Sequence, residues 1–356
     1  MNHHQQTIIS APSLKQFCEE VFAQRIPREE AVRVADNLVE ADLLGFSSHG
    51  VCKVSDYLQR LDKGLIENRT ELKKVTESST ASVLDASNGW GQYASVEAMQ
   101  EAVEKAKQYG TGVVGVRNSN HFGITSYYTM MAARKGCIGF ASTNASGLMV
   151  PFGSREPSLG TNPISIAVPA GEGRDPIVLD MSTGNTARGK ITLAKKTGDA
   201  IPEDWAVTKD GKRTSDPAEA LEGYLLPMGP KGSGLAIMVD ILSGVLTGAL
   251  FGSGVPRMYE DPEPQYLGHL FGAIDVKAFM EESAFYEKIM ERVAQTVESE
   301  PMEGFDRVYL PGEREQEKRR AQLEEGICLP HEIFAELKHM GEVHQVDISQ
   351  FVKSDW

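Results

Sequence analysis

His49 stands in the run SSHGV, where the surrounding residue types suit proton transfer better than core packing. An imidazole has an unperturbed pKa of ~6.5, so it can take up and release a proton near neutrality. Lys53 and Tyr57 follow His49 at steps of four residues, which places the three side chains on one face of a helix. The alternative interpretation is a plain helix end, in which Gly50 adopts the cap geometry and the two serines cap the next helix.

A second histidine, His121, stands in the run NSNHFG, directly after the β-branched residues 113–116. The end of a strand is a common place for a catalytic side chain, because the strand fixes the loop that carries it. A core histidine whose hydrogen bonds are all satisfied is the alternative. His121 is therefore a candidate for proton transfer.

Two glycine-rich loops contribute lysines. In LDMSTGNTARGK, residues 179–190, an expected strand runs into small residues that end in Lys190. In MGPKGSGL, residues 228–235, Lys231 stands before an expected long helix, the layout of an anion site at a helix N-terminus. The order GxxxxGK[ST] of a phosphate-binding loop is missing, so a simple turn is the alternative.

Other recognisable motifs are missing from the sequence. His331 and His339 lack the HExxH spacing of a zinc site, and no GxSxG nucleophile motif occurs. GTGVVG, residues 110–115, matches the dinucleotide pattern GxGxxG, but a helix precedes it and a strand follows, the reverse of the required order. We therefore interpret Gly110 as a helix C-cap. The remaining polar residues suit proton transfer beside a cofactor that carries the harder step.

The elements that must position these residues follow from hydrophobic spacing. Apolar residues at helical intervals predict helices over 14–24 and from Pro27 to about Gly45, so the first 75 residues form a small helical unit. Short β-rich runs between 138 and 207 favour a mixed sheet over a doubly wound parallel one. Further expected elements are a strand over 81–85, a helix over 95–109, a loop over 261–265 and a polar helix over 314–326.

Composition narrows the class of protein. The chain has 356 residues and a net charge of −14, which argues against a nucleic-acid partner. Four scattered cysteines, and a start that is not basic then apolar, predict a cytoplasmic protein without a signal peptide. The longest apolar stretch, residues 234–251, carries Asp240 near its centre, so we expect a buried, tightly packed helix rather than a membrane span.

Six motifs, taken in order, resemble one known family. They are ADLLGFSSHGV, RNSNHFG, VPFGS followed by LGTNPISIAVP, LDMSTGNTARGKI, GPKGSGLAIMVDILSGVLTG and VYLPGE, within a match from about residue 31 to about 325. Together they are similar to the malate/L-lactate dehydrogenase family of the non-Rossmann type, which includes ureidoglycolate, sulfolactate and diketogulonate oxidoreductases.

The resemblance implies an α/β fold of the family's own, with a mixed sheet and a small N-terminal helical domain. It implies a helical domain over 1–75, a core and dimerisation domain over 76–120 and 258–356, and a cofactor-binding domain over 121–257. It also implies NAD as cofactor, with NADP as the alternative, a small anionic substrate, and a homodimer with active sites near the subunit interface. Neither a nucleic acid nor a membrane is an expected partner.

The resemblance also assigns roles to residues. His121 and His49 fall at the catalytic positions, and Ser48, Lys53 and Tyr57 at the substrate. The residues implied for the cofactor are Asn144, Asp180, Met181, Ser182, Lys190, Lys231, Gly232, Gly312, Glu313 and Arg314.

Two departures from the family bear on the substrate. Relatives often carry arginine where this chain has Lys53, and arginine grips a carboxylate with two parallel bonds, whereas lysine offers a point charge. Ala145 and Ser146 replace the more polar Ser-Asp pair of ureidoglycolate enzymes. We therefore expect the acid group of the substrate to be held differently or elsewhere.

The implied reaction is hydride transfer between NAD(P) and a malate- or lactate-like 2-hydroxy acid. His121 rather than His49 is the expected general acid/base, because Lys53 lowers the pKa of its neighbour His49, and one ionisation near neutrality is expected. Ureidoglycolate oxidation and the reduction of other 2-oxo or imino acids are alternatives within the family. A lyase or hydrolase that uses His121 as a base, or a binding protein, is the alternative from another class.

Overall fold

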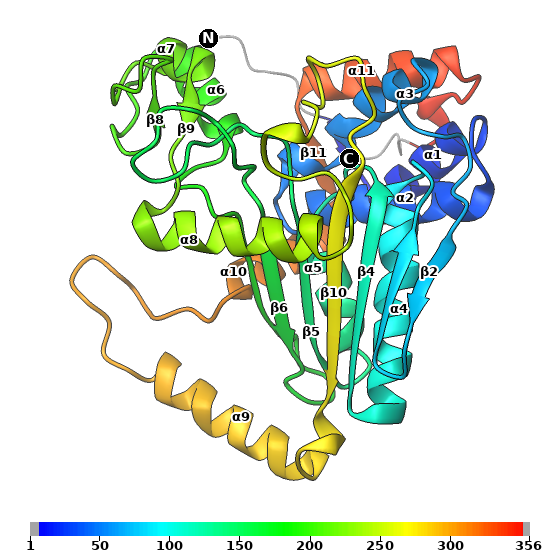
Figure 1. Ribbon diagram of the computed structural model, residues 1–356, viewed down its shortest axis with the longest axis vertical. Helices are drawn as coiled ribbons and strands as arrows, with labels where there is room; N and C mark the ends of the chain where they lie inside the picture. Colours follow the sequence, from blue (N-terminus) through cyan, green and yellow to red (C-terminus); the bar gives the residue numbers. More distant parts are fainter. Residues whose placement is uncertain (1–6, 352–356) are drawn as a thin grey trace.

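A seven-stranded mixed sheet forms the centre of the molecule, whose computed structural model describes residues 7–351 (Figure 1). In spatial order the strands are β2 (Lys73–Glu77), β3 (Ala81–Asp85), β4 (Thr111–Ser119), β10 (Leu267–Asp275), β5 (Cys137–Thr143), β6 (Ile164–Val168) and β7 (Ile177–Met181). Within this sheet β3 and β4 run parallel, and the other neighbouring pairs are antiparallel. The predicted mixed sheet is confirmed.

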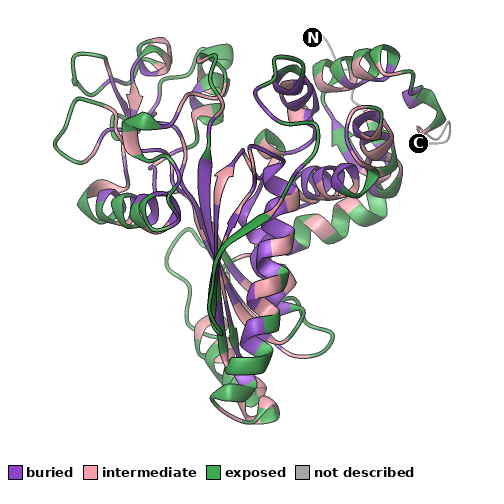
Figure 2. Cartoon of the chain, turned by 45° about the vertical axis from the view of Figure 1, so that its right-hand side comes forward, coloured by how far each residue is buried: buried purple, intermediate pink, exposed green. Residues whose placement is uncertain are grey.

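Two helices, α4 (Gly91–Tyr109) and α5 (Thr125–Ala133), cover one face of the sheet. Alternate strand residues such as Val114, Ala141 and Phe271 belong to the buried cluster on this face, which Figure 2 colours purple along the strands and the inner side of the long helix. Gly110 ends α4 with a φ of 89°, and β4 begins at the next residue. GTGVVG is therefore a helix end followed by a strand, as predicted.

The opposite face of the sheet is covered only in part. α8 (Gly229–Asp240) and the π-helical turn η3 (Ile241–Val245) lie across it, and Ser243 Oγ is 2.9 Å from Ser142 Oγ. Elsewhere on this face the strands present apolar side chains that stay partly or largely exposed, namely Val113, Ile138, Phe140, Ile166 and Ile274.

The expectation of a buried helix over residues 234–251 is wrong. Val239 and Ser243 face inward and are buried, but the other side of the same segment is apolar and exposed. A sequence does not distinguish a helix buried by its own chain from one that another chain would cover. The exposed apolar side chains are Ile237, Met238, Ile241, Val245, Leu246, Leu250 and Phe251. Within residues 7–351, no helix combines the length and the apolar character needed to cross a bilayer.

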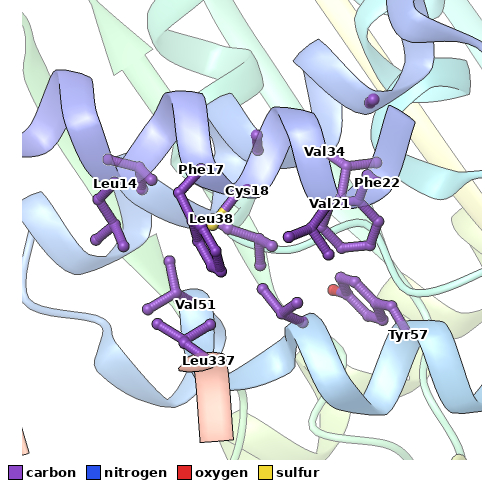
Figure 3. Packing of buried hydrophobic residues seen from close by; sticks show 14 of the residues in the cluster. Leu14, Phe17, Cys18, Val21, Phe22, Val34, Leu38, Val51, Tyr57 and Leu337 are labelled. Atoms are coloured by element: carbon purple, nitrogen blue, oxygen red, sulfur yellow. The ribbon is translucent and has the colours of Figure 1, made fainter. Parts of the chain in front are cut away.

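A second hydrophobic cluster joins the first helices to the C-terminal segment (Figure 3). The expected helices over 14–24 and after Pro27 are confirmed. Phe17, Leu38 and Tyr57 pack together here with Leu337. The elements are α1 (Ala11–Ala23), α2 (Arg28–Leu43), α3 (Val54–Asp62) and α11 (His331–Val343), with β1 (Thr7–Ile9) paired to β11 (Ile327–Leu329).

The remaining elements form a small lobe and an arm. The lobe has its own cluster, which includes Met149, Ile191 and Leu225. The arm contains a helix, α9, with no buried residue, and a long loop leads from it to the predicted polar helix, α10. Their bounds are α6 (Arg188–Thr197), α7 (Pro217–Glu222), β8 (Ala206–Val207), β9 (Tyr224–Leu225), α9 (Glu282–Val297) and α10 (Glu313–Glu325), and the short turns are η1 (Ser47–His49), η2 (Val51–Lys53), η4 (Gly252–Gly254), η5 (Val276–Ala278) and η6 (Ile348–Gln350).

The division into domains remains a proposal. Three hydrophobic clusters support three units, and residues 327–348 contribute to the same cluster as the first helices. The outer ends of the proposed division, residues 1–6 and 352–356, lie outside the described residues.

Candidate active site

Gly50 lies in the joint between α2 and α3 because a side chain there would collide with Asp42. An ideal Cβ on Gly50 would be 2.2 Å from Asp42 Oδ1, and Asp42 Oδ2 accepts a hydrogen bond from the Val51 N–H at 2.8 Å. Gly50 has an ordinary φ of −85°, whereas the positive φ after α2 belongs to Gly45. Gly50 does end a short helix, η1, but without the positive φ of a glycine cap, and glycine is required there because Asp42 approaches so closely.

The residues of this joint form one wall of a polar site. Neither serine caps α3, and Ser48 Oγ instead lies 2.9 Å from His49 Nδ1. The His49 ring stacks on that of His121, with centroids 5.6 Å apart and planes inclined by 23°. Tyr57 OH lies 2.7 Å from His121 Nδ1. The structure thus brings the two candidate histidines together, with Tyr57 against one of them.

His121 belongs to a loop that is fastened at the end of β4. Asn120 Nδ2 donates to the backbone oxygens of Asn88 and Gly89, at 3.0 Å each. Gly91, the first residue of α4, allows this loop to pack closely, because an ideal Cβ there would be 2.2 Å from Asn120 O. The backbone that carries His121 is therefore held from two sides.

Within the chain, His121 makes its hydrogen bonds through Nδ1, where Tyr57 OH lies at 2.7 Å and the Gly123 N–H donates at 3.3 Å. The Gly123 N–H uses a lone pair on Nδ1, which places the proton of the neutral ring on Nε2, whereas Tyr57 can accept from a proton on Nδ1 and leave the Nε2 lone pair to the site. Among the described residues no group forms a hydrogen bond with Nε2 of His121. Nε2 is therefore the atom that can exchange a proton with a ligand.

Both histidines are neutral at pH 7. Burial, and next the charge of Lys53, lowers the pKa of His49 to about 4. Burial, followed by the neighbouring His49 and Lys53, also holds the pKa of His121 well below its usual value. The expected ionisation near neutrality is therefore displaced to lower pH in the free protein. The lowering of the His49 pKa by Lys53 agrees with the sequence-based expectation.

Lys53 is not a solvated surface charge. Its side chain is 18% exposed, and Nζ donates to Asp56 Oδ2 at 2.9 Å and to Tyr259 OH at 2.5 Å. Burial opposes the charge of Lys53, but Tyr259 and Asp56 outweigh it and raise the pKa of the lysine. Nothing in the sequence pattern had pointed to Tyr259, which arrives from a distant loop.

Sequence reasoning also missed His269, which packs against the residue that follows His121. It is fully buried in β10, with Nδ1 2.7 Å from Thr143 Oγ1 and Nε2 2.8 Å from Ser119 Oγ. Its ring stacks on Phe122 with centroids 4.6 Å apart. Both nitrogens are engaged, so His269 fixes the end of β4 and the residue after His121 rather than reacting. An isolated histidine in an apolar strand was the available signal.

A cavity of about 340 Å³ lies at the end of β7. Asp180, Gly312 and Arg314 line it together with Phe46, which directly precedes η1. Gly312 has a φ of 81°, and an ideal Cβ there would be 2.7 Å from Val178 O, so only glycine lets this turn pack on β7. Burial raises the pKa of Asp180 to about 6. Two separate parts of the predicted cofactor set therefore meet here.

The first turn of α8 lies next to the chain that leaves β7. Met228 N donates to Thr183 O at 3.1 Å, and an ideal Cβ on Gly232 would be 3.0 Å from the same oxygen. The sequence predicted that Lys231 stands before the helix. The structure instead places Lys231 and Gly232 inside its first turn. Lys231 is exposed there, and Lys190 is exposed near the start of α6. Met181 and Ser182 lie at the end of β7, ahead of Thr183.

Three other predicted cofactor residues are engaged within the chain. Asn144 is buried, with Nδ2 donating to Asp240 Oδ1 and its Oδ1 accepting from the Gly268 N–H. Glu313 accepts from Arg307 at 2.6 Å. Arg314 lies over the Tyr309 ring, 4.2 Å from its centroid. Their contact with a cofactor remains a prediction.

This arrangement can bind a small anion and move a proton. Lys53 supplies a positive charge that stays protonated, and His121 Nε2 supplies an acceptor beside it. The cavity lined by Phe46 and Asp180 offers room for a further group. Proton transfer beside a bound cofactor is the chemistry that these groups support.

Comparisons with known proteins identify relatives along nearly the whole chain. A family model described as malate/L-lactate dehydrogenase matches residues 9–338. An L-sulfolactate dehydrogenase from Methanocaldococcus jannaschii is 40% identical over 92% of this chain and 94% of its own length. A ureidoglycolate dehydrogenase (NAD(+)) from Escherichia coli O157:H7 is 37% identical over 92% of this chain and 93% of its own. The crystal structure of malate dehydrogenase from Entamoeba histolytica superposes with a TM-score of 0.91 at 34% identity, covering 96% of this chain and 99% of that one.

Proposed function

This chain belongs to the malate/L-lactate dehydrogenase family, and on that premise we propose that it interconverts a malate- or lactate-like 2-hydroxy acid and the matching 2-oxo acid. It is an NAD(P)-dependent dehydrogenase that acts on a CH–OH group. The observation that carries the finer proposal is the pairing of His121 with His49 and Tyr57, next to the charge of Lys53.

The residues around the cavity fit a dinucleotide. Asp180, Met181 and Ser182 would hold one part of it with the turn at Gly312. The first turn of α8, with Lys231, would meet the pyrophosphate, because free backbone N–H groups and a cation both favour an anion. When bound, the nicotinamide supplies the acceptor or donor of the hydride.

The side chains of the wall perform the remaining steps. Lys53 binds the carboxylate of the 2-hydroxy acid, which brings the neighbouring hydroxyl to His121. In oxidation the hydroxyl proton passes to Nε2 of His121 as the hydride leaves carbon, so a carbonyl forms and charge balances. In reduction the same nitrogen returns the proton to the carbonyl oxygen. Neutral His49, held by Ser48 at 2.9 Å, contributes a hydrogen bond rather than a charge.

Ureidoglycolate oxidation is the second candidate. A relative of that name is 37% identical over most of the chain. Ala145 and Ser146 weigh against it, because they lack the carboxylate of the polar pair expected in such enzymes. We propose NAD over NADP, since no basic pocket for a 2′-phosphate stands out in the sequence. We also propose the cytoplasm as its compartment, on the same cysteine usage that the sequence shows.

The test of the proposed function is a panel of 2-oxo acids with NADH and NADPH. We expect loss of the nicotinamide absorbance with pyruvate, oxaloacetate or sulfopyruvate, and faster loss with NADH. Ureidoglycolate with NAD⁺ is the parallel assay for the second candidate. No turnover of any 2-oxo acid, with rapid oxidation of ureidoglycolate, would make ureidoglycolate oxidation the preferred function.

Replacing Lys231 with alanine is expected to raise the KM for the cofactor more than it lowers kcat. A cation in the first turn of a helix complements a pyrophosphate in the ground state and the transition state alike. Initial rates at varied NADH measure the change, and Lys209→Ala, which removes an equally exposed lysine from a loop, is the control. Equal cofactor KM in Lys231→Ala and Lys209→Ala would remove α8 from the cofactor site.

We also propose a homodimer with active sites near its interface. The exposed apolar side of α8 and η3 continues onto the partly covered face of the sheet, where Val113 and Ile274 remain about 40% exposed. Contiguous apolar surface of this kind marks an interface, and α9 buries none of its residues within its own chain. A sedimentation mass near twice 38.9 kDa is expected. A mass of one chain at working concentration would contradict it.

A further inference from the structure

Residues 252–266, which we call the strap, lead from η4 into β10 and reach the histidine wall from a distant part of the chain (Figure 1). Two neighbouring residues of the strap attach to the wall. Arg60 Nη1 donates to Met258 O at 2.6 Å, and Lys53 Nζ donates to Tyr259 OH at 2.5 Å. The strap is therefore attached where the substrate carboxylate is proposed to bind.

Arg60 shows that the strap is docked rather than merely adjacent. Arg60 is 4% exposed, and its Nε and Nη2 atoms have no hydrogen-bond partner among the described residues. Burial of a guanidinium is costly when its donors stay unpaired, so the carbonyl of Met258 supplies a bond that the buried cation needs. The backbone next to Tyr259 is held in place by that bond.

Tyr259 and Lys53 each retain a donor for a ligand. Lys53 has three N–H groups, of which Asp56 and Tyr259 take two. The Tyr259 oxygen accepts from Lys53, and its own hydrogen, which the Asp56 carboxylate accepts in the free protein, can turn toward a ligand instead. Burial raises the pKa of Tyr259, although Lys53 opposes the shift, so the hydroxyl stays protonated at neutral pH.

We propose that Lys53 and Tyr259 together grip the carboxylate of the substrate, with each donating to one of its two oxygens. The proposal rests on the 2-hydroxy acid function proposed above. Two donors 2.5 Å apart present a carboxylate with the paired geometry that a guanidinium fork would give. The strap thereby replaces the second bond that is lost when lysine stands at a position where relatives often carry arginine.

Replacing Tyr259 with phenylalanine tests the grip. We expect the KM for a 2-oxo acid to rise about 10- to 100-fold, the size of one hydrogen bond to a charged group, with little change in kcat or in the cofactor KM. Tyr266→Phe, at the other end of the strap, is the matched control and should leave all three constants unchanged. The KM for the methyl ester of the same acid should stay the same in Tyr259→Phe, because the ester lacks the carboxylate.

A rescue variant separates the grip from a structural role. Lys53→Arg combined with Tyr259→Phe should recover most of the lost affinity, since a guanidinium supplies both donors. An equal rise in KM for acid and ester, or no rise at all, would overturn the proposal. If the wild type reduced no 2-oxo acid, the proposed function would fail, and calorimetry with oxamate would still test the grip through the same loss in Tyr259→Phe.

Discussion

Replacing His121 with glutamine is expected to lower kcat by about 10²–10⁴-fold and to leave the cofactor KM unchanged. Glutamine keeps much of the size and one hydrogen bond but does not exchange a proton near neutrality. The ring is held in place by Tyr57 at 2.7 Å and by a fastened loop, so the loss reflects the missing proton acceptor. Steady-state rates in both directions with saturating cofactor measure the effect.

His49→Gln is the matched variant, because the two rings stack 5.6 Å apart in the same site. It should mainly raise the substrate KM, since His49 is expected to donate a hydrogen bond and not a proton. Loss of turnover in His49→Gln, with near-normal kcat in His121→Gln, would show that the two roles are reversed.

The pH dependence of the two directions should differ in a defined way. Oxidation needs neutral His121 as the base, and burial holds the pKa of His121 well below its usual value. The kcat/KM for oxidation should therefore stay level down through pH 6.5 and fall only at lower pH. Reduction needs the protonated ring, so its kcat/KM should fall as pH rises through the neutral range. Both slopes should vanish in His121→Gln, and an oxidation limb at or above pH 6.5 would contradict the assignment.

Local patterns predicted the elements of this fold well. Helical spacing located α1 and α2, and the order of helix before strand at residues 110–115 excluded a dinucleotide fingerprint correctly. The same kind of pattern failed at 234–251, where an apolar stretch was interpreted as buried. Hydrophobicity predicts that a surface will be covered, but it does not identify the covering chain.

The residues of the site also differ in whether local sequence could predict them. The prediction that His49, Lys53 and Tyr57 share one face of a helix is wrong, because they lie in three separate segments, η1, η2 and α3, with extended backbone at Gly50. They still line one wall, so the spacing identified the right residues for a different geometric reason. Gly50 was misinterpreted because its requirement comes from Asp42, eight residues earlier in the chain and in contact only once α2 is folded. Tyr259 could not be predicted at all, because its contact with Lys53 depends on how a loop before β10 crosses to α3. Contacts between distant loops carry no periodic signal.

Replacing Lys53 with methionine is expected to raise the substrate KM about 10- to 150-fold, which corresponds to about 1.5–3 kcal/mol for a hydrogen bond to a charged group. Methionine keeps an unbranched stem of similar length and removes the charge. A carboxylate brought into the site would then meet two neutral imidazoles and the Tyr259 hydroxyl without the charge of Lys53. The cofactor KM should not change, because Lys53 lies in η2 and does not line the cavity at the end of β7.

The competing explanation for Lys53 is a helix ion pair with Asp56, three residues along. Exposed pairs of that kind contribute about 0.2–1 kcal/mol to stability, and they leave substrate binding alone. Lys63→Met at the end of α3 removes an exposed lysine from the same helix and serves as the control. A substrate KM in Lys53→Met equal to that of Lys63→Met, together with a lowered melting temperature, would assign Lys53 to the ion pair alone. The expected result is a substrate KM that rises in Lys53→Met and not in Lys63→Met, with at most a small fall in melting temperature from the lost contacts with Asp56 and Tyr259.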